Sequence, residues 1–240
     1  EPLPAGAKTP AAHPAAQELD SLRGAHVLLV EDNDLNQEVA LGLLEDMGMR
    51  VDVADNGAIA LEMVQRQRYD LVLMDMQMPV MDGITATLAI RALANFTPPP
   101  IVAMTANAMQ VDRDRCAAAG MVDFVSKPIE PDELERALLR WIPPDAGRAE
   151  RAAAAPRTEP APAPTAPLQI EGLNTAAGLR RTLGKTDLYL NLLRKFEQGQ
   201  REVPAQIRSA LDAGDTALAQ RLAHTLKGVA GNIGAHDLQQ

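Results

Sequence analysis

The chain has 240 residues, of which 46% are hydrophobic, and a formal net charge of −9. This length suits one large domain or two modest ones. A single cysteine, Cys116, excludes an internal disulfide framework and indicates a reducing compartment, which we expect to be the cytoplasm. No apolar run approaches the length of a membrane span, so we expect no direct membrane contact here. A basic stripe is lacking and only six residues are aromatic, which argues against nucleic-acid binding.

Two segments rich in proline and alanine divide the chain. Residues 1–23 and 143–167 show no apolar periodicity, and the second holds seven prolines, so both are predicted to be extended linkers. They leave a body at 24–142 and a helical part at 168–240. The helical part carries nine Lys+Arg against seven Asp+Glu, a net charge of +2, which leaves −11 for the rest. Opposite charges on the two parts favour docking between them or with partners.

The body alternates between short apolar strands and amphipathic helices. Strands are predicted at 27–30, 51–54, 71–74, 101–104 and 124–125. Helices are predicted at 35–47, 57–67, 83–94, 110–118 and 131–141. Five such strand–helix units predict an α/β fold with a doubly wound parallel sheet.

Only helical periodicity is visible in the part after the second linker. Its apolar residues recur at helical spacing, with glycines between the runs: Leu188/Leu192/Leu193/Phe196, Val203/Ile207/Leu211, and a stretch from Asp215 onward. We therefore expect an all-α partial bundle at 168–240.

Polar side chains follow four of the five predicted strands. Glu31 and Asp32 come after the first strand, Asp75 after the third, Thr105 after the fourth and Lys127 after the fifth. In an open α/β sheet, ligands bind at the carboxyl ends of the strands. Three carboxylates gathered there favour a hard divalent cation, most plausibly Mg²⁺. Asp75 is then a candidate nucleophile toward a phosphoryl group, with Lys127 and Thr105 as partners of the transferred oxygens.

These residues resemble a response-regulator receiver domain. The likeness covers Glu31-Asp32, Asp75 in Met74–Pro79, Asp82-Gly83, Thr105-Ala106 and Lys127-Pro128. It implies a flavodoxin-like sheet with strand order 2-1-3-4-5 and a cis peptide bond between Lys127 and Pro128. It also implies phosphorylation of Asp75, Mg²⁺ ligation by Asp32, Asp75 and the backbone carbonyl of Gln77 with Glu31 partly through water, and a rotamer switch of Phe124 with Thr105.

Other nucleotide and phosphate folds fit these residues less well. A dinucleotide-binding fold or a P-loop would need glycines after the first strand, where the chain has Glu31-Asp32-Asn33. A haloacid-dehalogenase-like phosphatase would have a second aspartate two residues after the nucleophile, at Gln77.

A second signal lies around His224. On a helical wheel, Leu218, Leu222, Leu226, Val229 and Ile233 share one narrow arc, while His224, Lys227, Gly228 and Gly231 lie opposite. We predict an exposed histidine whose small neighbours admit another backbone and whose Lys227 steadies a phosphoryl group. Through His224-x-x-Lys227-Gly228 and Gly234, the segment resembles a histidine phosphotransfer (Hpt) domain, which implies that His224 is the phospho-histidine.

Together the two resemblances indicate a C-terminal fragment of a bacterial hybrid sensor histidine kinase. The Hpt bundle is expected to be truncated at Gln240, and a kinase core and any inner-membrane anchor are expected upstream of Glu1. That core would phosphorylate its own histidine, and the group would pass to Asp75, to His224 and then to a separate response regulator. The fragment lacks an ATP-binding motif, so we expect a phosphotransfer module and no ATP hydrolysis. The alternative is a receiver that regulates or dimerises on phosphorylation without onward transfer.

Overall fold

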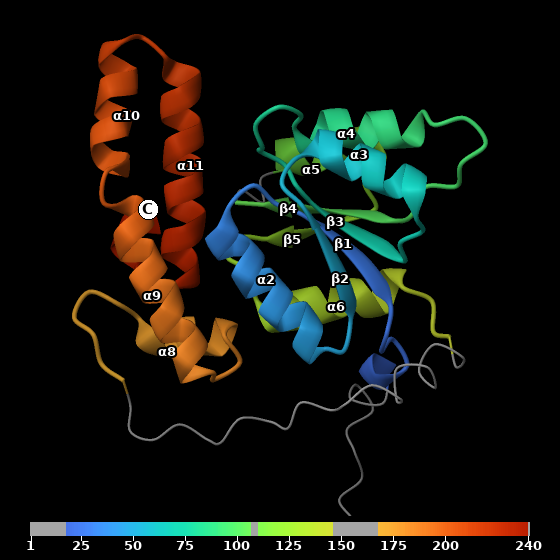
Figure 1. Ribbon diagram of the computed structural model, residues 1–240, viewed down its shortest axis with the longest axis horizontal. Helices are drawn as coiled ribbons and strands as arrows, with labels where there is room; N and C mark the ends of the chain where they lie inside the picture. The colour runs from blue at the N-terminus through green and yellow to red at the C-terminus, as the bar shows by residue number, and fades with distance from the viewer. Residues whose placement is uncertain (1–17, 107–109, 146–167, 240) are drawn as a thin grey trace, which may run out of the picture.

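A single parallel sheet organises the body of the protein. The computed structural model describes residues 18–106, 110–145 and 168–239 (Figure 1). The strands are β1 (His26–Val30), β2 (Arg50–Ala54), β3 (Leu71–Asp75), β4 (Ile101–Thr105) and β5 (Asp123–Ser126). All neighbouring pairs are parallel, in the order β2-β1-β3-β4-β5. The predicted α/β class and the strand order 2-1-3-4-5 are confirmed.

Helices cover both faces of this sheet, as the buried central strands β3 and β4 require. Figure 1 shows α3, α4 and α5 on one face and α2 and α6 on the other. Alternate side chains of each strand point to opposite faces, so Leu28 and Val30 pack in one apolar cluster while Val27 and Leu29 pack in the other. The helices are α2 (Asp34–Asp46), α3 (Gly57–Arg66), α4 (Gly83–Arg91), α5 (Gln110–Ala119) and α6 (Pro131–Trp141).

Three of these helices begin after an N-cap residue whose side chain accepts hydrogen bonds from amides of the first turn. Asn33 and Asn56 accept hydrogen bonds from the first amides of α2 and α3, and Asp82 accepts one from Thr85 at the start of α4. A Cβ on Gly83 would lie 2.2 Å from the backbone oxygen of Asp75, so only glycine lets α4 begin this close to β3. Capping therefore ties the helix starts to the carboxyl ends of the strands.

Residues 168–239 are helical, as predicted. The helices are α8 (Thr175–Arg181), α9 (Thr186–Gln200), α10 (Val203–Asp212), α11 (Thr216–Asn232) and α12 (His236–Gln239). Figure 1 shows α10 and α11 side by side as an antiparallel hairpin, with α9 continuing the hairpin downward toward α8. None of the described helices combines the length and apolar composition needed to cross a bilayer.

The helical part packs directly on the body. Figure 1 shows α2 between the sheet and the pair α9 and α11. Tyr189 and Leu192 of α9 and Val229 of α11 belong to the same apolar cluster as Leu29 of β1. The Tyr189 hydroxyl is buried and donates a hydrogen bond to the backbone oxygen of Ile233 at 2.8 Å. One continuous core thus spans the two parts, an arrangement that periodicity alone did not predict.

Candidate phosphotransfer site

Three carboxylates meet at the carboxyl ends of β1 and β3. Glu31 and Asp32 follow β1, and Asp75 is the last residue of β3, which lies beside β1 in the sheet. Carboxylate oxygens from all three lie within 4.8 Å of one another. Glu31 and Asp75 are buried, whereas Asp32 is half-buried. The strand order therefore brings together acids that are 43 residues apart in the chain, from Asp32 to Asp75.

Lys127 supplies the positive charge that this acidic cluster needs. Its Nζ lies 2.7 Å from Oδ2 of Asp75 and 2.5 Å from Oε2 of Glu31. Burial lowers the pKa of Lys127, but the charges of Asp75 and Glu31 outweigh burial and raise it, so the side chain stays a cation. The peptide bond that follows, Lys127–Pro128, is cis, as the resemblance implied.

The acidic cluster holds more carboxylates than the single cation of Lys127 can balance. Burial raises the pKa of Glu31 to about 7, with Lys127 opposing the rise and Asp75 adding to it. Burial and then Asp75 also raise the pKa of Asp32, while Lys127 and the more distant Arg221 oppose this. One lysine does not neutralise three clustered acids, so a further cation would be bound favourably here. Mg²⁺ is a hard cation that takes oxygen ligands, so the carboxylates present fit that ion.

Neighbouring amides hold these carboxylates in place. Asn36 donates a hydrogen bond to Oε1 of Glu31 at 2.8 Å, and Gln37 donates to the Glu31 backbone oxygen at 2.7 Å. The backbone N–H of Gln77 donates to Oδ1 of Asp75 at 3.3 Å. Asn36 and Gln37, both on α2, were not singled out from the sequence, and only the packing of α2 on β1 shows what they do.

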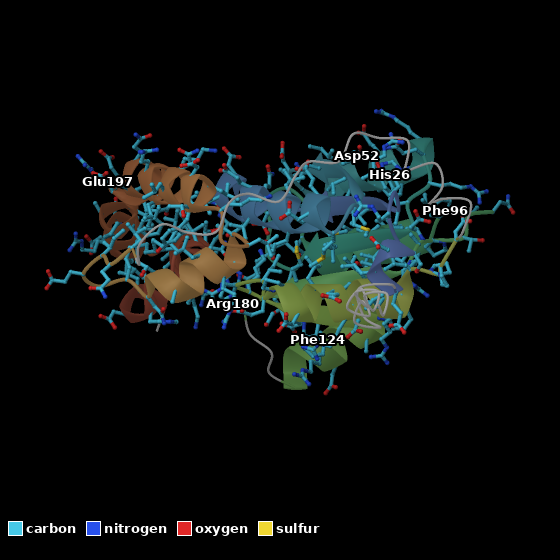
Figure 2. The ribbon with its side chains drawn as sticks, turned by 90° about the horizontal axis from the view of Figure 1, so that it is seen from below. His26, Asp52, Phe96, Phe124, Arg180 and Glu197 are labelled. Atoms are coloured by element: carbon cyan, nitrogen blue, oxygen red, sulfur yellow. The ribbon has the colours of Figure 1, made fainter. Side chains whose placement is uncertain are left out.

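Thr105 and Phe124, the two predicted switch residues, lie on the neighbouring strands β4 and β5. Thr105 ends β4 and is buried, and its backbone oxygen accepts a hydrogen bond from the Lys127 amide at 2.7 Å. Phe124, labelled in Figure 2, lies on β5 with the Arg113 guanidinium 4.0 Å from its ring centroid. A cation at this distance from an aromatic ring is attracted to its face. The switch role of Thr105 and Phe124 stays a prediction.

His224 lies on α11 and is directed toward the body. Its Nε2 is buried and has no hydrogen-bond partner among the residues that the structure describes. Burial lowers the pKa of His224, as do Lys127 and Lys227, while Asp75 opposes the change. The lowered pKa favours the neutral imidazole, and the charges of Asp75 and Lys127 act on it across the interface.

The expectation of an exposed histidine face was wrong in one respect. His224 is half-buried, and Gly228, Gly231 and Asn232 on the same side of α11 are buried, because α2 covers them. A Cβ on Gly228 would lie 3.6 Å from the Asn36 side chain, so the small residues admit the body's α2. Lys227 remains exposed one turn from His224, as predicted.

Polar contacts across this interface were not foreseen. The Asn232 amide donates a buried hydrogen bond to Oδ1 of Asn36 at 2.8 Å. Four ion pairs also cross, each with its cation on the helical part and its acid on the body: Arg181–Glu130, Arg180–Glu130, Lys185–Asp46 and Lys195–Glu38. The sequence offered only the opposite net charges of the two parts as a signal for them.

Comparison with known proteins finds two families along this chain. Residues 27–139 match the response regulator receiver domain and residues 191–240 match the Hpt domain. The sensor histidine kinase GacS of Pseudomonas protegens is 37% identical over 227 residues, covering 93% of this chain and 24% of the relative. The histidine-protein kinase BarA of Escherichia coli K12 is 35% identical over 208 residues, covering 87% and 22%. The chain thus spans about a quarter of the length of these relatives.

Among solved structures, the receiver domain of a sensor histidine kinase from Pseudomonas aeruginosa PAO1 is similar. That structure has a magnesium ion coordinated in its active-site cleft. It is 49% identical, covers 50% of this chain and 98% of its own, and has a TM-score of 0.47. The two family matches show that residues 27–139 belong to the response regulator receiver family and residues 191–240 to the Hpt family, the two domain types of a phosphorelay.

Proposed function

We propose that Asp75 accepts a phosphoryl group and passes it to His224 of the same chain. The observation that carries this proposal is the docked histidine. Its buried Nε2 has no partner among the described residues, and its pKa responds to the charges of both Asp75 and Lys127. A buried polar atom without a partner is costly unless it has a reaction to perform.

In the first step, a carboxylate oxygen of Asp75 attacks the phosphorus of a phospho-histidine on a kinase core. The new P–O bond forms as the P–N bond breaks, and the leaving imidazole keeps the bonding electron pair. Lys127, held 2.7 Å from Asp75, stabilises the charge on the transferred oxygens, and Thr105 offers its hydroxyl as a donor. The product is an acyl phosphate on Asp75.

In the second step, the lone pair of neutral His224 Nε2 attacks the same phosphorus. The P–N bond forms, the P–O bond to Asp75 breaks, and Asp75 leaves as a carboxylate that again pairs with Lys127. Lys227, one turn along α11, is placed to balance the charge of the phospho-histidine. The group then passes to an aspartate of a separate response regulator, the partner that the Hpt family implies.

We propose that Glu31, Asp32, Asp75 and the backbone carbonyl of Gln77 hold Mg²⁺ during these steps. When bound, the ion neutralises charge on the carboxylates and on the phosphoryl oxygens. Support comes from the three carboxylates whose oxygens lie within 4.8 Å of one another and from the raised pKa values of Glu31 and Asp32.

The upstream donor is proposed to be the kinase core of a sensor histidine kinase that contains this chain. The support is the identity to GacS and BarA over most of this chain, although the chain covers only 24% and 22% of those relatives. Such a core meets ATP in the cytoplasm, where the thiol of Cys116 would stay reduced.

A labelling experiment tests the transfer. The 240-residue chain is incubated with Mg²⁺ and a small labelled phosphodonor, and acid-stable, base-labile label on Asp75 is followed as it becomes acid-labile label on His224. His224→Gln should trap the label on Asp75. Asp75→Asn should abolish labelling at both residues and weaken Mg²⁺ binding, measured by titration calorimetry. Full labelling of Asp75→Asn would show that the site is assigned wrongly.

The second candidate is a phosphorylation-switched receiver without onward transfer. The contact between Arg113 and Phe124 favours it, because a change of the Phe124 rotamer would release Arg113 on the α5 surface. Label that stays on Asp75 in the wild-type chain, with His224 unlabelled, would support this function and reject the relay.

A further inference from the structure

Arg181 is a buried charge that none of the proposed chemistry uses. It ends α8, and only 5% of its surface is exposed. A buried guanidinium is costly unless its donors find partners, and here they all point inward. Nε and Nη2 donate to Oε1 of Glu130 at 3.0 and 2.6 Å, and Nη1 donates to the backbone oxygen of Gly231 at 2.6 Å.

These partners connect the two halves of the proposed transfer site. Glu130 lies three residues after Lys127, as the N-cap residue of α6. Gly231 lies on α11, two turns after His224. The Arg181 guanidinium therefore joins the loop that carries Lys127 to the helix that carries His224. Figure 2 shows the neighbouring Arg180, which also pairs with Glu130, where the C-terminal helices meet the receiver.

Burial sets this contact apart from the other ion pairs across the interface. Lys185–Asp46 and Lys195–Glu38 are solvent-exposed pairs, and such pairs contribute little because water screens them. Here the burial is that of Arg181, whereas the Glu130 side chain is 32% exposed, so removing Glu130 leaves a buried cation without its acidic partner, which weakens an interface strongly. The planar fork of Arg181 also fixes an orientation, which a flexible lysine does not.

We propose that Arg181 is a positioning residue for transfer between Asp75 and His224, acting through Glu130 and the backbone of α11. It sets the angle at which α11 meets the receiver, so that His224 faces Asp75. The pair also makes the transfer specific, because a receiver without an acid at the position of Glu130 would leave the Arg181 charge buried without an acidic partner. This inference rests on the proposed transfer from Asp75 to His224.

The test measures transfer within the 240-residue chain, after Asp75 is labelled by a small phosphodonor. Glu130→Gln leaves the bond from Arg181 to Gly231 intact and should slow transfer to His224 about tenfold, with the labelling rate of Asp75 unchanged. Arg181→Gln should slow transfer to the same extent, and Arg181→Lys should recover part of the loss. The double variant should be no slower than either single variant, because both remove one shared contact.

Asp46→Asn is the matched control. It removes another receiver acid that pairs with a cation of the Hpt region, at an exposed position, and it should transfer at the wild-type rate. Thermal unfolding followed by circular dichroism shows whether Arg181→Gln loses helix, and Glu130→Gln tests the proposal from the receiver side in either case.

Failure of the Arg181 role and failure of the proposed relay give different results. Wild-type transfer with an unaffected Glu130→Gln variant, or losses that multiply in the double variant, would overturn the role of Arg181. No transfer to His224 in the wild-type chain would instead overturn the proposed relay, and the positioning role with it.

Discussion

Lys127 shows how one side chain serves both folding and chemistry. Its Nζ contacts Asp75 and Glu31 at once, and all three side chains are buried. Without a cation between them, two buried carboxylates would repel each other and lose the solvation that water gives them. The same ammonium lies beside the oxygen that is proposed to attack phosphorus. Lys127 therefore stabilises the buried acidic cluster and also supplies a positive charge for a phosphoryl group.

Replacing Lys127 with Met should slow labelling of Asp75 by a small phosphodonor about 100-fold, since one preorganised electrostatic partner of the reacting oxygens is lost. The measurement is the initial rate of acid-stable label formation at saturating Mg²⁺. Lys185→Met removes an exposed lysine far from Asp75 and serves as the control. A Lys127→Met chain that labels at the wild-type rate would contradict the assigned role.

A second polar group predicts how stability depends on pH. Asp52 on β2 accepts hydrogen bonds from His26 and Tyr69, each at 2.9 Å, and from Gln67 (Figure 2). Burial acts to raise the pKa of Asp52, but these bonds and the charge of His26 prevail and lower it. Burial likewise raises the pKa of Tyr69 to about 12, so the phenol stays a donor, with Arg50 nearby opposing the rise.

The lowered pKa of Asp52 determines how the free energy of unfolding changes with pH. A carboxyl whose pKa is lower in the folded state contributes stability above its unfolded pKa of about 4, and loses it as the pH falls through the folded value. The free energy of unfolding of wild type should therefore exceed that of Asp52→Asn at pH 6, and the gap should shrink below pH 4. Urea titrations at both pH values measure this, and a gap that is constant with pH would refute the argument.

Among the elements, α11 has residues of two kinds, apolar and small, that pack against different neighbours. Its apolar residues join the apolar cluster that the Hpt region shares with the receiver, and its small residue Gly228 faces α2 of the receiver. Interior glycines cost a helix about 1 kcal/mol each relative to alanine, so their presence calls for a compensating contact. The compensating contact is the close approach of Gly228 to Asn36, and Asn36 in turn donates to Glu31.

Substitutions of Gly228 separate helix propensity from docking. Gly228→Ala places a Cβ 3.6 Å from Asn36, an ordinary contact, and should raise helix stability by about 0.5–1 kcal/mol with transfer retained. Gly228→Leu should push α11 away from α2 and slow transfer from Asp75 to His224 about 100-fold, since small misplacements of reacting groups are costly. Thermal unfolding and the transfer assay check the two effects. Wild-type transfer by Gly228→Leu would show that α2 and α11 need not approach so closely.

At the scale of the whole molecule, ion pairs add to the apolar packing between the receiver and the Hpt region. The receiver contributes Asp46 and Glu38 to the rim of the interface, and the Hpt region contributes Lys185 and Lys195. Each exposed pair contributes little alone, but all carry the same polarity and favour one docking orientation. The apolar cluster that extends from β1 through α2 to α9 and α11 supplies the bulk of the contact.

Reversing both lysines, Lys185→Glu with Lys195→Glu, should slow transfer to His224 severalfold at low ionic strength through like-charge repulsion. The loss should shrink as salt is added, because the Debye length falls from about 10 Å at 0.1 M to about 3 Å at 1 M. Arg201→Glu is the control, since Arg201 lies after α9 and pairs with Glu197 of that helix. A loss that does not depend on salt would argue against electrostatic docking.

The sequence by itself determined the local elements and the inventory of the site. Five apolar runs predicted the five strands, because a strand buried on both faces needs a continuous apolar stretch. The carboxyl ends of parallel strands share one edge of the sheet, which is why the sequence predicts Asp32, Asp75 and Lys127 in one site. The cis bond before Pro128 and the order of the strands came from the resemblance to receivers, and both are confirmed.

Only the tertiary structure decided how the two parts meet. The glycines of α11 and the opposite net charges of the two parts indicate a docking contact. Neither feature predicts which surface of the receiver α11 contacts. Burial of Gly228, the bond between Asn232 and Asn36, and the place of Arg181 between Glu130 and Gly231 join residues from about 50 to 196 positions apart. Periodicity reports which face of a helix is apolar, whereas the partner of a polar or small face depends on contacts between distant segments. The sequence therefore singled out His224 for its chemistry, and only the fold shows that its Nε2 is buried.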